Sequence, residues 1–299
     1  IGSEDVQITS SQSAPIVTVI SGNTIITSIT FEQDEDSNPA ILLQGGNSRF
    51  EKCTFKSSAE KASTVIVENN ANVYFKNCKF LGSSDSPAIE CSGDSIVFCE
   101  DCQFEDSEGD LISLNGNCTF YLTNGSLTKA KSTAISINEH SHSILKSTKF
   151  TNCEYGINIS SDSTSNVFRS LTFEDIEENC LVMTSQSNAQ IHGSTFRSSK
   201  KPAIKCKKES KLLLLQNRII PGRWKGISLF DESRIECSDG DIGGYVNIRS
   251  ESVFVGMHTN FHTAGIHLAG TGDLQCHNCT LQSIENGRPA IEAEEESTL

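Results

Sequence analysis

The chain has 299 residues, of which 36% are hydrophobic, and a formal net charge of −14 at pH 7. No apolar run approaches the roughly 20 residues that a membrane-spanning helix needs, so we expect no membrane insertion by these residues. The acidic balance also argues against nucleic acid as a partner, because most of the surface would repel phosphate groups.

A short hydrophobic motif recurs every 19–25 residues along the chain. It reads Pro or a small residue, Ala or Gly, an aliphatic residue, any residue, and then an aliphatic residue or Cys, as in the segments that begin at Pro39, Pro87, Pro202 and Pro289. A second motif recurs with the same spacing. Its hydrophobic residue is Phe31, Phe55, Phe80, Phe104, Leu127, Phe150, Phe173, Phe196, Ile219, Ile242, Phe261 and Leu281. A fixed period of this length indicates stacked structural repeats.

Each period contains three short runs in which apolar and polar residues alternate. In the repeat of residues 87–104 the apolar pairs are Ile89 with Cys91, Ile96 with Phe98, and Cys102 with Phe104. Such alternation, bounded by Gly, Ser, Asn or Asp, is typical of a half-buried strand. We therefore expect these apolar residues to point inward.

The sequence predicts an all-β fold, because no repeat contains an apolar stripe at the 3.6-residue spacing of a helix. Three strands per turn indicate a right-handed, single-stranded parallel β-helix, a solenoid of about twelve rungs of 19–25 residues. We expect one domain over residues 1–299. Because the last repeat is cut off at Leu299, we also expect this chain to be an excerpt of a longer protein, or to be covered there by a partner or another domain. One internal column should hold Phe55, Phe80, Phe104, Phe150, Phe173 and Phe196.

These repeats resemble the pectin-lyase-like superfamily of right-handed β-helices, in its generic repeat form. That superfamily includes pectate lyases, polygalacturonases, epimerases, phage tailspikes, adhesin passengers and substrate-binding domains of F-box proteins, so the resemblance implies a fold and leaves the activity open. Its members often stack Asn two residues before the hydrophobic residue of the third strand. This chain has Asn217 there, before Ile219, and elsewhere mainly Cys, at Cys53, Cys78, Cys102 and Cys279.

The twelve cysteines bear on the cellular compartment. Neighbouring rungs would hold their sulfur atoms about 4.8 Å apart with parallel Cβ vectors, which fits disulfide torsions poorly. We therefore expect buried, reduced thiols and favour an intracellular location. A cell-surface or secreted location is the alternative, with four Asn-x-Ser/Thr sequons in its favour. The cysteines at inward positions are Cys53, Cys78, Cys91, Cys102, Cys206 and Cys237.

Metal chemistry has little support in the sequence. Cys276 and Cys279 form a Cys-x-x-Cys pair with His277 between them, but a structural zinc site needs four converging ligands. The acidic turn of residues 34–36 is more typical of a solvated loop than of a calcium site. We expect no metal and no cofactor.

An enzyme of this superfamily would bind its substrate in a groove along the outside of the stack. We therefore examine the outward residue in the middle of the first of the three strands in each repeat. No two neighbours in this column are carboxylates, whereas galacturonase-like hydrolysis needs a pair of them. The enzyme signatures of the superfamily are also absent, so the sequence favours a non-catalytic protein. The column reads Leu42, Ile66, Glu90, Ser113, Ser136, Asn158, Val182, Lys205, Ser228, Asn247, His267 and Glu292.

Residues 197–225 carry ten basic residues and one acidic residue, whereas the remaining chain carries 14 basic and 37 acidic residues. Such a basic segment in an acidic protein suits an acidic peptide, a phosphate or a sulfated glycan, unless neighbouring rungs neutralise it. We expect the partner-binding patch at Lys200, Lys201, Lys207, Lys208, Arg223 and Trp224.

Two functions remain in view. The first is a non-catalytic recognition or scaffold module that binds a protein partner along a lateral face of the β-helix. The alternative is a carbohydrate-active enzyme, such as a polysaccharide lyase or hydrolase, or a glycan-binding adhesin.

Overall fold

The computed structural model describes residues 6–11, 14–34, 38–58, 62–82, 85–160, 162–163, 165–197, 200–220, 225–283, 290–294 and 297–298. These residues form short parallel β-strands joined by turns. No helix able to cross a membrane occurs among them. The backbone divides into two compact units, unit 1 (Ile1–Glu154) and unit 2 (Tyr155–Leu299). The single domain expected over residues 1–299 stays a prediction.

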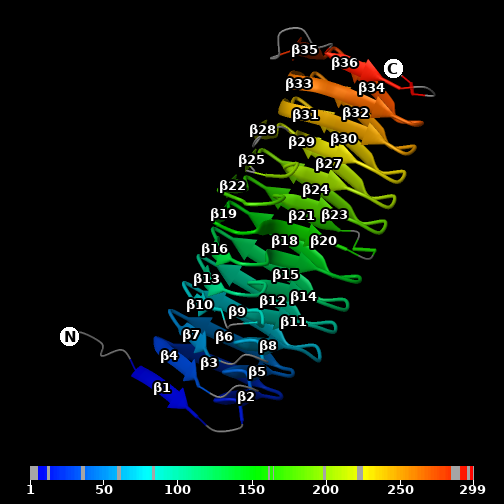
Figure 1. Cartoon of the computed structure of the whole chain (residues 1–299). Coiled ribbons are helices and arrows are strands. Elements are labelled where there is room, and N and C mark those ends of the chain that lie inside the picture. The colour runs from blue at the N-terminus through cyan, green and yellow to red at the C-terminus, as the bar shows by residue number, and fades with distance from the viewer. Residues whose placement is uncertain are drawn as a thin grey trace. The chain divides into compact units, whose positions relative to one another are not determined.

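Each coil of unit 1 contributes a first, a middle and a third strand (Figure 1). The first strands are β2 (Val17–Val19), β5 (Ile41–Leu43), β8 (Val65–Val67), β11 (Ile89–Cys91), β14 (Ile112–Leu114) and β17 (Thr133–Ile137). The middle strands are β3 (Asn23–Thr27), β6 (Asn47–Glu51), β9 (Asn72–Lys76), β12 (Ile96–Glu100), β15 (Thr119–Thr123) and β18 (His142–Lys146). The third strands are β1 (Val6–Ser10), β4 (Ile29–Gln33), β7 (Thr54–Ser57), β10 (Lys79–Leu81), β13 (Gln103–Ser107), β16 (Ser126–Ala130) and β19 (Lys149–Thr151).

Unit 2 repeats this plan with one variation. Its first strands include β20 (Tyr155–Ile159), β23 (Leu181–Met183), β26 (Ile204–Cys206), β29 (Lys225–Leu229) and β36 (Ile291–Ala293). Its middle strands are β21 (Asn166–Arg169), β24 (Asn188–His192), β27 (Lys211–Leu215), β30 (Arg234–Ser238), β32 (Val253–Met257) and β34 (Asp273–His277). Its third strands include β22 (Thr172–Glu174), β25 (Thr195–Arg197), β28 (Arg218–Ile220) and β35 (Thr280–Ser283).

The variation in unit 2 explains the shorter repeats near the end of the chain. In β31 (Asp241–Arg249) and β33 (Asn260–Ala269), the third strand of one coil continues into the first strand of the next. A shift of register between Gly243 and Tyr245 replaces the corner loop that other coils have. The spacing between equivalent hydrophobic residues therefore falls from 23 residues to 19 and 20 in these coils.

The predicted fold class is confirmed. The chain is all-β and forms a parallel β-helix of about 11 turns, close to the twelve rungs expected. Strands pair in strict register with their equivalents one coil away, as when Ile89 pairs with Val65 on one side and with Ile112 on the other. Each coil therefore buries its inner face against its two neighbours.

The inner column of phenylalanines is present within each unit. In unit 1, Phe55, Phe80 and Phe104 pair in register, and their stacked ring centroids lie 4.9 and 4.7 Å apart. In unit 2, Phe173 and Phe196 stack at 5.0 Å. All five side chains are fully buried, as the alternation predicted, and Phe150 of unit 1 is buried with them.

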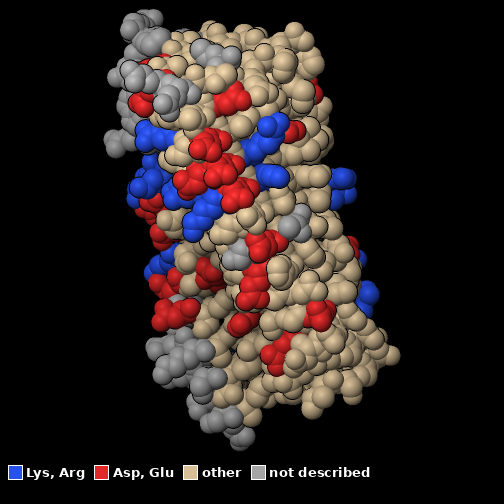
Figure 2. All heavy atoms as spheres, turned by 90° about the vertical axis from the view of Figure 1, so that its right-hand side faces the viewer, with Lys and Arg blue, Asp and Glu red and all other residues tan. Residues whose placement is uncertain are grey.

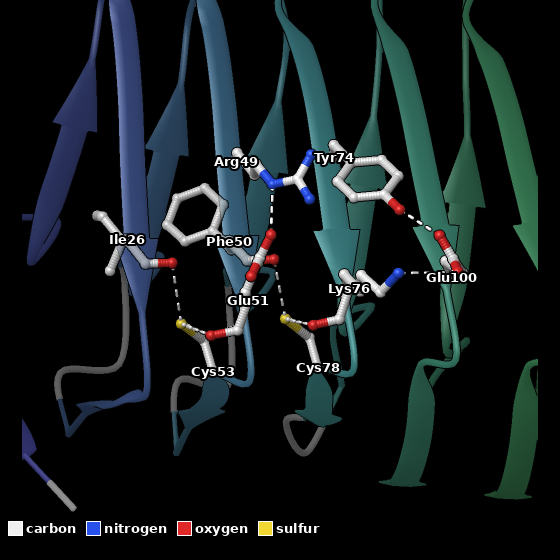
Figure 3. A network of polar contacts seen from close by, with 9 residues as sticks. All are labelled: Ile26, Arg49, Phe50, Glu51, Cys53, Tyr74, Lys76, Cys78 and Glu100. Carbon is white, nitrogen blue, oxygen red and sulfur yellow. Dashed lines mark hydrogen bonds and ion pairs between the residues drawn. The ribbon is translucent and has the colours of Figure 1, made fainter. Parts of the chain in front are cut away.

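The corner between middle and third strands is a single residue with positive φ, such as Lys52, Asn77 or Asp101. The next residue points inward and donates to main-chain carbonyls. The thiol of Cys78 lies 3.4 Å from Lys76 O and 3.5 Å from Phe50 O in the preceding coil. Figure 3 shows this arrangement at two successive coils. The Cys ladder therefore adds a side-chain donor at the bend to carbonyls such as Lys76 O, which also accepts a hydrogen bond from the main-chain N–H of Lys52.

Unit 2 fills the same corner position with other donors. Ser194 Oγ lies 3.2 Å from His192 O, and Asn217 Nδ2 lies 2.8 Å from Ile191 O. Asn217 Oδ1 in turn accepts a hydrogen bond from the main-chain N–H of Ser194 at 2.8 Å. Asn217 thus takes the position that the family resemblance assigns to Asn.

A second ladder, of serines, was not predicted. It follows the short turn between first and middle strands, in which one or both residues have positive φ, as Lys208 and Glu209 do. Ser233 Oγ donates to Phe230 O at 2.7 Å and lies 3.4 Å from Ser210 Oγ. The fully buried members are Ser95, Ser141, Ser163, Ser187, Ser210, Ser233 and Ser252.

The expected orientation of the middle strand was wrong. Ile96 and Phe98 were expected to point inward, but Val97 and Cys99 are the buried residues and Phe98 is 40% exposed. The reason is the serine ladder: Ser95 points inward directly after the turn, so the alternation that follows it buries every second residue from Ser95 onward.

The phenylalanine column leads to a stability prediction. Replacing Phe104 by Ala removes a fully buried ring that stacks on Phe80, so the free energy of unfolding should fall by about 3–5 kcal/mol. Denaturant titration of both proteins measures this loss. A loss below about 1 kcal/mol would contradict the assigned packing.

Candidate functional site

The structure places the predicted basic patch at the two ends of one strand. Lys200 and Lys201 lie in the corner that precedes β26, and Lys207 and Lys208 lie in the turn that follows it. The other two predicted residues, Arg223 and Trp224, lie outside the described residues. The four described lysines therefore flank the outer face of β26.

Part of this positive charge is neutralised within unit 2. Lys200 forms an ion pair with Glu177, and Lys201 Nζ lies 3.9 Å from Glu178 Oε2. On the face drawn in Figure 2, Lys and Arg side chains lie beside Asp and Glu side chains in the same way. Exposed pairs of this kind contribute at most about 1 kcal/mol each, so an acidic ligand can replace the internal partner at little cost.

A positive excess remains on the outer face of β26. Lys205 points outward from the middle of this strand, and burial lowers the pKa of its ammonium group. Nearby Lys207 and Lys201 lower that pKa further, against the opposing influence of Glu178. Within the described ranges, no carboxylate oxygen lies within 4.0 Å of Lys205 or Lys207. Positive charge therefore outweighs negative charge at this strand.

The outward column continues from Lys205 as a row of polar residues. The strands pair Lys205 with Ser228, Ser228 with Asn247, and Asn247 with His267. Ser228 and Asn247 are only 2% and 5% exposed although they point away from the core. Larger neighbouring side chains therefore cover them. We call these four residues the unit 2 row.

Contacts at the far end of the unit 2 row hold its side chains in place. Asn247 Oδ1 lies 3.1 Å from Arg249 Nε and 3.2 Å from His267 Nδ1. His267 Nε2 lies 3.1 Å from Glu294 Oε1, and the imidazole stacks on the Tyr245 ring with centroids 6.3 Å apart. Arg249 thereby adds a further positively charged group to the face that carries Lys205.

A second polar network, which the sequence did not predict, lies on the outer face of the middle strands in unit 1 (Figure 3). Arg49 Nε lies 2.5 Å from Glu51 Oε1, and its guanidinium lies 4.6 Å from the Tyr74 ring centroid. The Tyr74 hydroxyl donates to Glu100, which also pairs with Lys76 at 3.1 Å. The hydrogen bond to Glu100 raises the pKa of Tyr74 to about 12, and those to Tyr74 and Lys76 lower the pKa of Glu100.

The candidate metal ligands do not converge. In the part of the chain that the structure describes, no group of three or more His, Cys, Asp or Glu side chains is placed to hold a metal ion. That finding includes Cys276, Cys279 and His277. Of the acidic turn at residues 34–36, only Asp34 is described.

No pair of carboxylates meets in the outward column. Glu90 pairs with Ile66 and Ser113, and Glu292 pairs with His267. The arrangement in unit 2 instead offers ammonium, guanidinium, imidazole and amide groups at successive coils. Such groups bind anions.

Comparisons with known proteins agree with this fold. The family model of the right handed beta helix region matches residues 87–242, which is more than half of the chain. The chain therefore belongs to the right handed beta helix family. No curated protein matches the chain.

Solved structures with a similar backbone include the periplasmic alginate epimerase AlgG. A point mutant of that enzyme has a TM-score of 0.60 and 9% sequence identity, and the match covers 87% of this chain and 70% of that one. The unmutated enzyme has a TM-score of 0.57 and 8% identity, with 88% and 77% of the two chains covered. Identities this low show a shared fold.

The cysteines give a second prediction. All twelve are free thiols, ten of them buried, while Cys276 is exposed and Cys279 is half-buried. With a thiol reagent at pH 8, two groups should react in the native protein and twelve after denaturation. Partial desolvation of the thiol and the neighbouring Cys279 raise the pKa of Cys276 to about 12, so its labelling rate should rise about tenfold per pH unit above pH 8. Three or more disulfides in the isolated protein would contradict the prediction of reduced thiols.

Proposed function

We propose that this chain is a non-catalytic recognition module that binds an acidic segment of a partner protein along the outer face of unit 2. The supporting observation is the positive excess at β26, where burial, and after it the neighbouring Lys207 and Lys201, lower the pKa of the Lys205 ammonium group. An anion bound there would relieve the repulsion among these lysines, which gives a physical reason for binding.

The unit 2 row extends this surface across three further coils. Arg249 and His267 lie two and three coils from Lys205, and successive coils are about 4.8 Å apart. An acidic segment in an extended conformation could therefore place one carboxylate against Lys205 and another against Arg249, while Ser228 and Asn247 stay covered. The partner-binding residues proposed here are Lys200, Lys201, Lys207 and Lys208, with Arg223 and Trp224 as further candidates from the sequence.

An anionic glycan is the second candidate ligand. Lysine, arginine and histidine side chains bind the carboxylates of acidic sugars as readily as those of Glu and Asp. The fold shared with alginate epimerases makes this alternative worth testing directly, either as glycan binding or as a carbohydrate-directed activity.

Charge reversal tests the proposal. Changing Lys200, Lys201, Lys207 and Lys208 together to Glu should weaken binding of a fluorescent deca-glutamate peptide at least tenfold, because several exposed ion pairs act together. The control reverses Lys52, Lys56, Lys129 and Lys131 of unit 1, which changes the net charge equally. That control should bind as the unaltered protein does, and both variants should keep its melting temperature.

The salt dependence of binding and the affinity for sugar ligands provide two further tests of the proposal. Binding of the peptide should weaken as salt rises, because screening shortens the reach of the field to about 8 Å at physiological ionic strength. Equal loss in both charge-reversed variants would show a net-charge effect and refute a site at β26. Tighter binding of alginate or heparin fragments than of the peptide would favour the glycan alternative, and release of unsaturated or reducing sugar ends would refute a non-catalytic role.

A further inference from the structure

The coil at residues 273–283 carries two cysteines on either side of one bend. Cys276 lies in β34, Cys279 directly precedes β35, and Asn278 makes the bend between them with a φ of 53°. Cys276 occupies an inward position, because strand pairing aligns it with the buried Cys237 two coils earlier. Cys276 is nevertheless exposed and Cys279 is half-buried, whereas the other ten cysteines are buried.

Both side chains point to the space beside Gly256. Gly256 pairs in register with Cys276, so the inward side of one lies about 4.8 Å from the inward side of the other. The sulfur of Cys279 reaches the same place, because a Cβ atom added to Gly256 would lie 3.1 Å from Cys279 Sγ. The two thiols therefore meet where the preceding coil has no side chain.

The bend gives this pair a geometry that the Cys ladder lacks. Ladder cysteines on neighbouring coils, such as Cys53 and Cys78, have parallel Cβ vectors, which fit disulfide torsions poorly. Cys276 and Cys279 lie in one coil and face its interior from two sides of the bend at Asn278. Their Cβ vectors therefore converge.

The two sulfur atoms also interact electrostatically. Partial desolvation raises the pKa of the Cys276 thiol to about 12, and the charge of Cys279 and a hydrogen bond to it add to this rise. A group that raises the pKa of a neighbour through its negative charge is the ionised member of the pair. Cys279 therefore supplies the thiolate, which is the nucleophilic form of cysteine.

An inner coil has the same Cys-x-x-Cys spacing at the same positions. Cys99 lies in β12, and Cys102 follows the bend that Asp101 makes with a φ of 54°. The two cysteines are only 3% and 0% exposed. They differ from Cys276 and Cys279 mainly in access to solvent, so the chain contains its own matched control.

We propose that Cys276 and Cys279 form a redox-active dithiol, which low-molecular-weight disulfides oxidise to an intramolecular disulfide. This site is independent of the acidic-segment site proposed for unit 2. It involves none of the lysines of that surface, so either proposal can fail while the other stands.

The reaction consists of two thiol–disulfide exchanges. Cys279 first loses the thiol proton that it donates to His277 O at 3.6 Å. Its thiolate attacks one sulfur of the reagent, forms a mixed disulfide and expels the other half as a thiolate. Cys276 then loses its proton and attacks the Cys279 sulfur, which forms the internal bond and expels the second half. The two cysteines lose two electrons and two protons, and the reagent gains them as two thiols.

Oxidation with glutathione disulfide tests the proposal. The reduced full chain is incubated with the reagent at pH 8, free thiols are alkylated in denaturant, and the peptides are identified by mass spectrometry. One disulfide should form, between Cys276 and Cys279, and the other ten cysteines should be alkylated. No internal disulfide, a bond from Cys279 to Cys237, or equal oxidation of Cys99 with Cys102 would overturn the proposal.

Single substitutions test the order of the two exchanges. The variant Cys276→Ser should accumulate a mixed disulfide at Cys279, because no second thiol can displace the bound glutathione. The variant Cys279→Ser should take up glutathione at least tenfold more slowly at pH 8, since Cys276 retains its proton. Equal rates in the two variants would overturn the assignment of Cys279 as the attacking thiol.

A redox titration of the unaltered protein covers the case in which a variant misfolds. In buffers of reduced and oxidised glutathione, the fraction of the Cys276–Cys279 disulfide should rise to completion with a single midpoint. It should return to zero when reduced glutathione is added in excess. Mixed disulfides that persist on the unaltered protein, or a bond that forms only in denaturant, would overturn the proposal.

Discussion

Stacking of the coils in strict register is the constraint on which the rest of this chain depends. One coil of about 23 residues cannot enclose a core, so its inward side chains are buried only when the next coil repeats them at the same positions. At the bends, inward side chains also donate hydrogen bonds to main-chain carbonyls such as Lys76 O. The inward positions are therefore committed to packing, as with Phe80, or to hydrogen bonding, as with Cys78 and Ser233.

This commitment leaves the outward side chains to interact with other molecules. The described outward surface offers two distinct kinds of row, one in each unit. The unit 2 row begins at Lys205 and combines positive and hydrogen-bonding groups. The outward face of the middle strands in unit 1 instead carries the stacked rings of Phe98 and Tyr121 and the ion pair of Lys76 with Glu100. Parallel register turns a single outward residue into a row at intervals of about 4.8 Å, which suits an extended segment better than a compact ligand.

The sequence predicted the structure correctly where one type of residue recurs at a single position of each repeat. The repeat spacing predicted the fold and the buried column of Phe104, because an aromatic residue at a fixed interval has one explanation. It failed for the middle strand, since Ile96 and Phe98 alternate as well as Val97 and Cys99 do, and only the inward Ser95 decides between the two registers. The partial neutralisation of the basic patch could not be predicted either, because its acidic partners lie 23 residues earlier in the chain, one coil away.

Lysine side-chain NMR during titration with an acidic peptide tests the central claim, that unit 2 holds a site for an acidic segment, most directly. The ammonium resonances of Lys201, Lys205 and Lys207 should shift together and saturate at one peptide concentration, while Lys129 and Lys131 of unit 1 should remain unchanged. Uniform small shifts at all five lysines, or shifts confined to unit 1, would contradict the assignment of this site to the outer face of β26.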